Sequence, residues 1–191
     1  KSIIKTKLGL NERIYARKCE LKEIDNQREF LDNNHLQGYI PAKINIGLYY
    51  NDELTSLLTF SKPRFNKNYD WEMIRFVNKI GYSVIGGFSK LLKYFLNNYQ
   101  GSIITYSDIR LFDGKVYETN GFTQIESSKP SYYYTDYKNR YSRQKFQKHK
   151  IPNILESFNS NLTEWENMQM NGWDRIWDCG NYVYIKNDSN K

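Results

Sequence analysis

Two polar side chains in this sequence have the chemistry of acid–base catalysts. His35 is one of only two histidines, and an imidazole near pH 7 can accept or donate a proton. Asp108 follows the apolar run Ile103–Tyr106, and a carboxylate at a strand end can line a cleft and orient a base or an amine. The alternatives remain open that His35 is a structural loop residue and that Asp108 caps a turn.

A glycine-rich stretch precedes the clearest helix of the chain. Apolar residues recur on one face of a helix over 83–98, at Val84, Phe88, Leu91, Leu92 and Phe95. Glycines let a backbone approach an anion closely, and a helix N-terminus favours negative charge. The stretch that ends in Gly86 and Gly87 therefore either binds an anion or serves only as a tight turn into a packed helix.

Metal chemistry has little support in the sequence. Cys19 and Cys179 stand far apart and belong to no Cys/His cluster, which argues against zinc and indicates reduced thiols. Asp70 and Glu72 are the only close carboxylate pair on an expected strand, and no Glu-x-Lys follows them. A Mg²⁺-dependent nuclease needs clustered carboxylates, so this chain shows no nuclease centre and no metal site.

The net charge of +7 is concentrated in two short segments. Residues 1–18 carry six basic side chains and one acidic, and residues 129–150 carry seven and one. The second segment interleaves tyrosines with Lys138, Arg140, Arg143, Lys145 and Lys148. Cations contact phosphates and phenol rings can stack on bases, so DNA is the expected partner. A solvated basic surface helix is the alternative.

Composition and pattern indicate one soluble domain with a real core. Apolar residues make up 39% of the 191 residues and aromatic residues 16%, and no run approaches the ~18 apolar residues of a membrane helix. The expected strands are 16–24, 44–50, 54–61, 71–77, 102–106, 122–126, 131–135 and 182–186. The expected helices are 27–34, 83–98, 115–120, 139–150 and 163–170, with Asn51-Asp52 as a hairpin turn. Residues 122–126 and 131–135 are expected to pair.

This order of elements resembles the GNAT acyltransferase fold over roughly 17–135. The family has a Q/R-x-x-G-x-G/A loop that holds the pyrophosphate of coenzyme A, and here Gly86 matches its first small position. Ser83 and Phe88 depart from the pattern, and a Phe could block the phosphates. If the resemblance extends to the cofactor, acetyl-CoA or another acyl-CoA would be held by Ser83, Ile85, Gly86, Gly87, Phe88 and Ser89. Val116–Phe122 is similar to the family's LYxxxGF ending, which implies that Tyr117 protonates the leaving thiolate, although a packing role is the alternative.

Two further resemblances point toward phage proteins. Asn34-His35-Leu36-Gln37-Gly38 is similar to a segment of the GNAT-like Mom-type DNA-modification proteins. The stretches 14–19, 34–38, 143–149 and 171–181 look like phage-encoded homing-endonuclease-like proteins, in which a Vsr-like nuclease domain precedes such a region. This resemblance implies that the nuclease carboxylates would lie upstream of Lys1. It also implies a protein of the host cell's cytoplasm.

The sequence therefore predicts an α/β (α+β) protein with a GNAT-like mixed, mostly antiparallel sheet flanked by helices and a basic helical C-terminal extension. We expect a lead-in at 1–15, the GNAT-like domain at 16–136, and an extension at 137–191 that packs on the same domain. The expected function is a DNA-binding module of a homing-endonuclease-like protein. The alternative is an N-acyltransferase that modifies a nucleobase or other amine, with His35, Asp108 and Tyr117 within about 12 Å of one another around one pocket.

Overall fold

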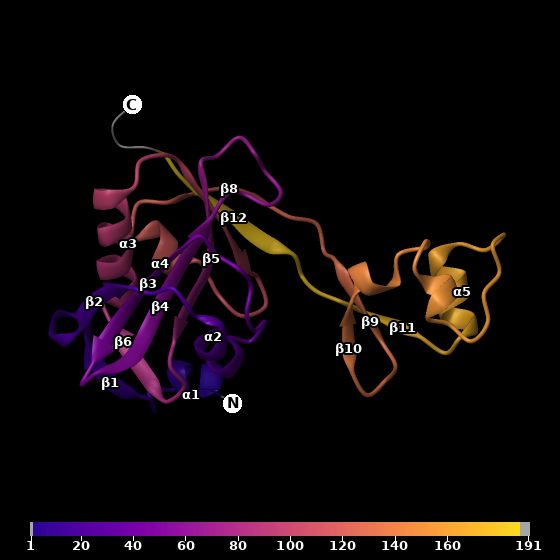
Figure 1. The fold of residues 1–191 in the computed structure, drawn as a ribbon, viewed down its shortest axis with the longest axis horizontal. Coiled ribbons are helices and arrows are strands. Elements are labelled where there is room, and N and C mark those ends of the chain that lie inside the picture. Colours follow the sequence, from indigo (N-terminus) through magenta and orange to yellow (C-terminus); the bar gives the residue numbers. More distant parts are fainter. Residues whose placement is uncertain (1, 188–191) are drawn as a thin grey trace. The chain divides into compact units, whose positions relative to one another are not determined.

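Seven strands form the main sheet of this computed structural model, which describes residues 2–187 (Figure 1). The order is β2-β3-β4-β5-β7-β12-β8. In that order the strands are Glu20–Glu23, Ile44–Tyr50, Glu53–Ser61, Trp71–Asn78, Ile103–Asp108, Asn181–Lys186 and Thr123–Ser127. Strands β2 to β5 pair antiparallel, whereas β5 and β7 are parallel. Asn51 and Asp52 join β3 to β4 with φ values of 50° and 62°, as a tight hairpin turn requires.

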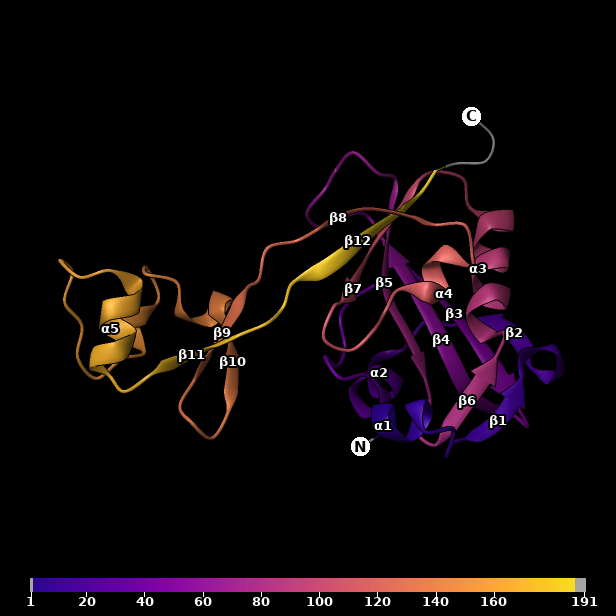
Figure 2. The same cartoon turned by 180° about the vertical axis from the view of Figure 1, so that it is seen from behind.

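Two helices cover opposite faces of this sheet (Figures 1 and 2). Helix α3 (Gly87–Asn98) lies against β3 and β4, and its Phe95 ring stacks on Phe60 with centroids 3.6 Å apart. Helix α2 (Arg28–Asn34) packs Leu31 against Leu57 and Val77 on the other face. The core is therefore built by the apolar faces of two helices on the central strands β3, β4, β5 and β7, which are largely buried, whereas β8 is exposed.

The N-terminal segment is folded into the same unit. Helix α1 (Ser2–Lys7) precedes β1 (Glu12–Tyr15), which pairs in parallel with β6 (Tyr82–Ile85) as a separate two-stranded sheet. A 3₁₀ turn, η1 (Ala16–Lys18), follows β1 and leads into β2. Helix α4 (Lys115–Glu118) stands between β7 and β8 in the chain.

A second unit has its own sheet and its own core. Strand β9 (Tyr132–Thr135) lies between β10 (Arg140–Ser142) and β11 (Asp174–Trp177), both antiparallel to it. The turns η2 (Arg143–Phe146) and η3 (Ile151–Asn153) and helix α5 (Glu164–Met170) complete the unit. Its buried cluster consists of Tyr132, Tyr134, Phe146, Ile151 and Met168. Aromatic rings supply most of this core, which is how a small unit buries enough surface.

The boundaries of the units differ from the expected domains. The first unit contains, of the described residues, 2–106, 114–126 and 183–187, and the second contains 107–113 and 127–182. Residues 12–15 are a strand of the first unit rather than a linker. The chain crosses between the units four times, and local composition carries no signal of such crossings. A division at 136/137 would cut β9 from its partner β10.

Four expected elements differ in the structure. Residues 16–24 contain η1 before the strand, and the helix expected from 83 begins at Gly87 because 82–85 pair with β1. Residues 122–126 and 131–135 do not pair with each other, since β8 neighbours β12 and β9 neighbours β10 and β11. The basic helix expected over 139–150 is a short strand and a 3₁₀ turn instead. Tyr141 and Phe146 are the only apolar residues of that segment, and a spacing of five makes no helical face.

Candidate functional site

Strands β5 and β7 pair at one end and part at the other. The parallel ladder joins Trp71–Met73 to Ile103–Thr105 and stops there, while β5 continues to Asn78. A bulge displaces β5 at Ile74, because Thr59 of β4 faces Arg75 and Phe60 faces Met73. A bulge bends its strand, and this one follows directly after Met73, the last residue of β5 that pairs with β7. The expected splayed parallel pair beside the central helix is confirmed.

The side chain of Tyr117 reaches the point at which these strands part. Its hydroxyl shares a hydrogen bond with Thr105, and Thr105 donates its own hydroxyl proton to the Met73 carbonyl. Its ring packs edge-on against Phe88 with centroids 5.6 Å apart. Burial raises the pKa of the Tyr117 phenol, and the Thr105 hydrogen bond opposes that rise. Tyr117 therefore keeps its proton at neutral pH, and its hydroxyl lies beside the residue at which the pairing of β5 and β7 ends.

The turn into α3 has the form that a close backbone approach requires. Gly86 is the N-cap with φ 77°, a left-handed conformation that favours glycine. A Cβ on Gly87 would lie 3.0 Å from the Val84 side chain, so this position also has little room for a side chain. Ile85, Gly86 and Ser89 are exposed. The first N–H groups of a helix have no partner within it, so an anion at this surface would meet free donors.

Ser83 and Phe88, the two departures from the cofactor pattern, have structural explanations. Ser83 belongs to β6 and stands opposite Arg13 of β1. Phe88 is buried, and its ring packs against Phe76 of β5 and against Tyr117. The Phe88 side chain thus points into the core and leaves the backbone at Ile85–Gly86 uncovered. The expectation that it could block the phosphates is not supported by this packing.

His35 lies on the α2 side of the sheet as the C-cap residue of α2. Its Nδ1 accepts a hydrogen bond from the Gln37 backbone N–H at 3.1 Å. Burial, and after it the positive charge of Arg75 on β5, lower the pKa of His35 to about 4. The neighbouring Asn34 accepts from the Ile80 backbone N–H at 2.8 Å, which ties α2 to the loop after β5. His35 is therefore a neutral imidazole at pH 7.

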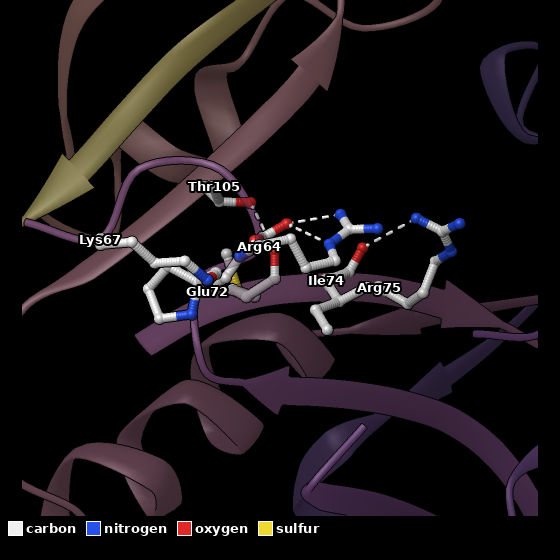
Figure 3. Close-up of polar contacts among 8 residues, drawn as sticks. Arg64, Lys67, Glu72, Ile74, Arg75 and Thr105 are labelled. Atoms are coloured by element: carbon white, nitrogen blue, oxygen red, sulfur yellow. Dashed lines mark hydrogen bonds and ion pairs between the residues drawn. The ribbon is translucent and has the colours of Figure 1, made fainter. Parts of the chain in front are cut away.

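A buried carboxylate on β5 was not among the expected catalytic residues. Glu72 is 1% exposed and accepts from the Arg64 backbone N–H at 2.8 Å and from Arg64 Nε at 3.0 Å (Figure 3). On the same strand, Arg75 donates to the carbonyl of Ile74. A charge within the apolar run Trp71–Val77 was the available signal, since a buried carboxylate must be paired. Glu72 and Arg64 fix the loop before β5 and neutralise each other.

Asp108 is engaged by a neighbour in its own turn. Its carboxylate accepts from the backbone N–H and the Nε of Arg110, both at 3.0 Å. These bonds, the side-chain one foremost, lower the pKa of Asp108. Asp108 belongs to the second unit, whereas His35 and Tyr117 belong to the first. The expected separation of about 12 Å among the three stays a prediction.

The expected nucleic-acid contacts divide between the units. Five exposed cations of the second unit lie on β10, on η2 and in the segments beside them: Lys138, Arg140, Arg143, Lys145 and Lys148. Of the basic lead-in, Lys5, Lys7, Arg13, Arg17 and Lys18 lie on α1, β1 and η1 of the first unit, and Lys1 lies outside the described residues. Over residues 2–187, no group of three or more His, Cys, Asp or Glu side chains could hold a metal ion.

Comparison with solved structures gives this fold its class. The chain is similar to an acetyltransferase of Bacillus subtilis in complex with CoA, with a TM-score of 0.51 and 12% identity over 89% of this chain and 99% of that chain. It is also similar to a GNAT-family acetyltransferase of Bacillus cereus (TM-score 0.43, 12% identity, 85% of this chain and 79% of that chain). A third is Naa50 of Arabidopsis thaliana with the bisubstrate analogue CoA-Ac-MVNAL (TM-score 0.49, 13% identity, 88% of this chain and 98% of that chain).

The chain has a mixed α/β fold of the GNAT type, with a mostly antiparallel sheet flanked by helices. No protein-family model matches the sequence, and no curated protein matches it either. None of the helices within residues 2–187 has both the length and the apolar character to cross a membrane.

Proposed function

We propose that this chain is an acyl-CoA-dependent N-acyltransferase that acts on an amine. The observation that carries the proposal is the exposed turn at Gly86, which opens α3 directly beside the unpaired part of β5. Phe88 in the first turn of α3 contacts both Phe76 of β5 and Tyr117. An anion at Gly86 and a proton on Tyr117 would thus serve one extended donor molecule. The acetyltransferase of Bacillus subtilis to which the chain is similar was solved in complex with CoA, which supports this choice of donor.

The residues present fit such a donor. The exposed backbone of Ile85, Gly86 and Ser89 would hold the pyrophosphate, because glycine there admits close approach and the helix terminus favours anions. When bound, acyl-CoA supplies a thioester carbon that is open to attack by an amine. Tyr117 holds a proton on its hydroxyl for the sulfur that departs as the C–N bond forms and the C–S bond breaks. His35, neutral at pH 7, is our candidate to accept the proton that the amine loses.

The finer expectation, a DNA-engaging module of a phage homing-endonuclease-like protein, has less support. The chain is similar in fold to an acetyltransferase of Bacillus subtilis that was solved in complex with CoA. Whether the acceptor amine belongs to a nucleobase, as in the Mom-type resemblance, is part of the proposal to be tested. Contact with nucleic acid is a separate question, which rests on the second unit.

Calorimetric titration with CoA and acetyl-CoA tests the donor. Binding should appear in the wild type and should weaken about tenfold or more in Gly86→Ala, since an L-residue is strained at φ 77°. Gly172→Ala is the matched control, because Gly172 has φ 76° and open space but lies in the second unit. A thiol-release assay with a panel of amines then tests turnover. No binding of CoA at millimolar concentration would overturn the proposal.

A further inference from the structure

Strands β1 and β6 turn one face of their two-stranded sheet outward. Ile14 and Val84, which are partners in this ladder, are both buried, so their neighbours along each strand point the other way. These neighbours form two register pairs, Arg13 with Ser83 and Tyr15 with Ile85. Both members of the second pair are 47% exposed. We call these four outward residues the β1–β6 face.

The β1–β6 face ends at the turn that opens α3. Its last residue on β6, Ile85, is followed directly by Gly86, the N-cap of α3. On the other strand, η1 begins where β1 ends, and a Cβ added at Gly86 would lie 3.9 Å from the Ala16 side chain. Lys90 of α3 donates to the Ala16 carbonyl at 3.0 Å. The turn η1 is therefore held beside the backbone that would bind the pyrophosphate.

An exposed cation of η1 lies over this face. Arg17 is exposed, and its guanidinium lies 5.2 Å from the centre of the Tyr15 ring. A ring contact leaves the N–H groups at the guanidinium edge free to bind an anion. Within residues 2–187, Arg17 forms no salt bridge with a carboxylate. Glu12, the one acidic residue of β1 and β6, alternates with the outward positions and so belongs to the other face.

The neighbouring turn indicates which anion fits this cation. In CoA one ribose carries the pyrophosphate on one carbon and a further phosphate, the 3′-phosphate, on another. A cation that contacts the 3′-phosphate must therefore lie within one ribose of the pyrophosphate. Arg17, in the turn beside Gly86, meets this condition. The Arg13 guanidinium instead lies near Gly9, and Lys93 is about two helical turns beyond Gly86.

We propose that Arg17 binds the 3′-phosphate of the acyl-CoA donor and so selects CoA thioesters over thioesters whose carrier lacks that phosphate. The inference rests on the proposed function, because it concerns the same donor with its pyrophosphate at Gly86. A phosphate with about two negative charges and a guanidinium fork form charge-assisted hydrogen bonds. The Tyr15 ring supports the fork. Arg17 thus determines the choice of donor and takes no part in the chemical step.

Calorimetric titration of the full chain with CoA and with 3′-dephospho-CoA, which lacks only that phosphate, tests the assignment. The wild type should bind CoA at least about tenfold more tightly, as expected for hydrogen bonds to a charged group. In Arg17→Ala this preference should fall below about threefold, because affinity for CoA drops while affinity for dephospho-CoA stays the same. Arg17→Lys keeps the charge without the fork and should retain more of the preference than Arg17→Ala.

The matched control is a second exposed arginine of the same unit that also lies over a tyrosine ring. Arg28 of α2 has its guanidinium 4.0 Å from the centre of the Tyr39 ring, on the other face of the main sheet. Arg28→Ala should keep the tenfold preference for CoA, because removing a distant exposed charge is screened by salt. Circular dichroism confirms that each variant is folded.

Three outcomes would overturn this assignment while CoA still binds. The wild type could bind CoA and dephospho-CoA equally, Arg17→Ala could keep the full preference, or Arg28→Ala could lose as much of it as Arg17→Ala. Each would leave the proposed donor in place and remove Arg17 from its recognition. If neither compound binds the wild type at millimolar concentration, the proposed function fails, and this inference fails with it.

Discussion

The hydroxyl of Tyr117 is hydrogen-bonded to the side chain of Thr105 at the last paired position of β5 and β7. Met73, the partner of Thr105 in the ladder, accepts the Thr105 hydroxyl proton through its carbonyl. A residue of α4 is thereby held at the point where the pairing of β5 and β7 ends, two strands that are adjacent in the sheet but separated by α3 in the chain. The contact joins the fold directly to the proposed proton donor.

Replacement of Tyr117 by Phe should lower the rate of acyl transfer while leaving the packing of the ring, and so the stability, nearly unchanged. The ring contacts with Phe88, Phe122 and Tyr184 remain, so stability should change by less than about 1 kcal/mol. The proton donor is lost, so the rate of acyl transfer should fall about 100-fold while CoA affinity stays the same. Stopped-flow thiol release and calorimetry measure the two effects. Tyr99→Phe, which removes a hydroxyl bound to Glu23, is the control. A Tyr117→Phe variant with the wild-type rate would remove Tyr117 from the mechanism.

Local signals predicted the parts of the fold that local sequence determines. The amphipathic pattern from Phe88 to Phe95 specified α3, and Asn51-Asp52 specified the hairpin turn through its tolerance of positive φ. The helix expected over 163–170 is confirmed as α5. Its capping box corresponds to a simple spacing in the sequence, Thr163 followed three residues later by Glu166. In each case the residues that define the element are its own neighbours in sequence.

The elements that local sequence did not predict depend on pairing between residues far apart in the chain. The pairing of β6 with β1 joins Tyr82 to Glu12 across about seventy residues, and nothing within 82–85 distinguishes that strand from the start of a helix. Strand β9 takes partners from both sides, Tyr141 opposite Tyr134 on one and Arg175 on the other. Such choices follow from the whole core rather than from a local period. The same limit applies to the site, where the contact of Tyr117 with Thr105 depends on the strand order.

The effects of substituting Arg64 and Glu72 on the free energy of unfolding should be strongly coupled. Arg64→Ala leaves the Glu72 carboxylate, 1% exposed, without the guanidinium. The free energy of unfolding should fall by about 2 kcal/mol, below the usual cost for a buried pair because Arg64 is 38% exposed. The double variant Arg64→Met/Glu72→Leu should recover at least half of that loss, since no unpaired charge remains buried. Urea denaturation measures both, and a double variant that is less stable than Arg64→Ala would contradict the coupling.

The capping box at Thr163 should stabilise the second unit alone. Thr163→Ala removes the hydroxyl that accepts from the Glu166 backbone N–H and should cost about 1 kcal/mol. Thr163→Ser retains a hydroxyl and should cost little. Three of the four tryptophans, Trp165, Trp173 and Trp177, lie in this unit, so tryptophan fluorescence during urea denaturation follows it. Equal midpoints for the Ala and Ser variants would show that the cap contributes nothing.

The burial of His35 should make stability depend on pH between about 4 and 6.5. The folded protein lowers the pKa of His35 to about 4 from an ordinary 6.5, through burial first and the charge of Arg75 second. In this interval the unfolded chain binds a proton that the folded chain does not. The stabilisation is therefore complete above the unfolded pKa and is lost as pH falls toward about 4.

His35→Asn tests this dependence while it keeps an acceptor for the Gln37 backbone N–H. Between pH 7 and pH 4.5, His35 should account for a loss on the order of 2 kcal/mol in the free energy of unfolding. The wild type should lose that much more than His35→Asn, as measured by urea denaturation at the two pH values. His149→Asn, at the other histidine, is exposed and should behave as the wild type. If the wild type and His35→Asn lose equal stability, His35 is not held neutral by its surroundings, and it would then carry a proton in weak acid and could not act there as the base for an amine.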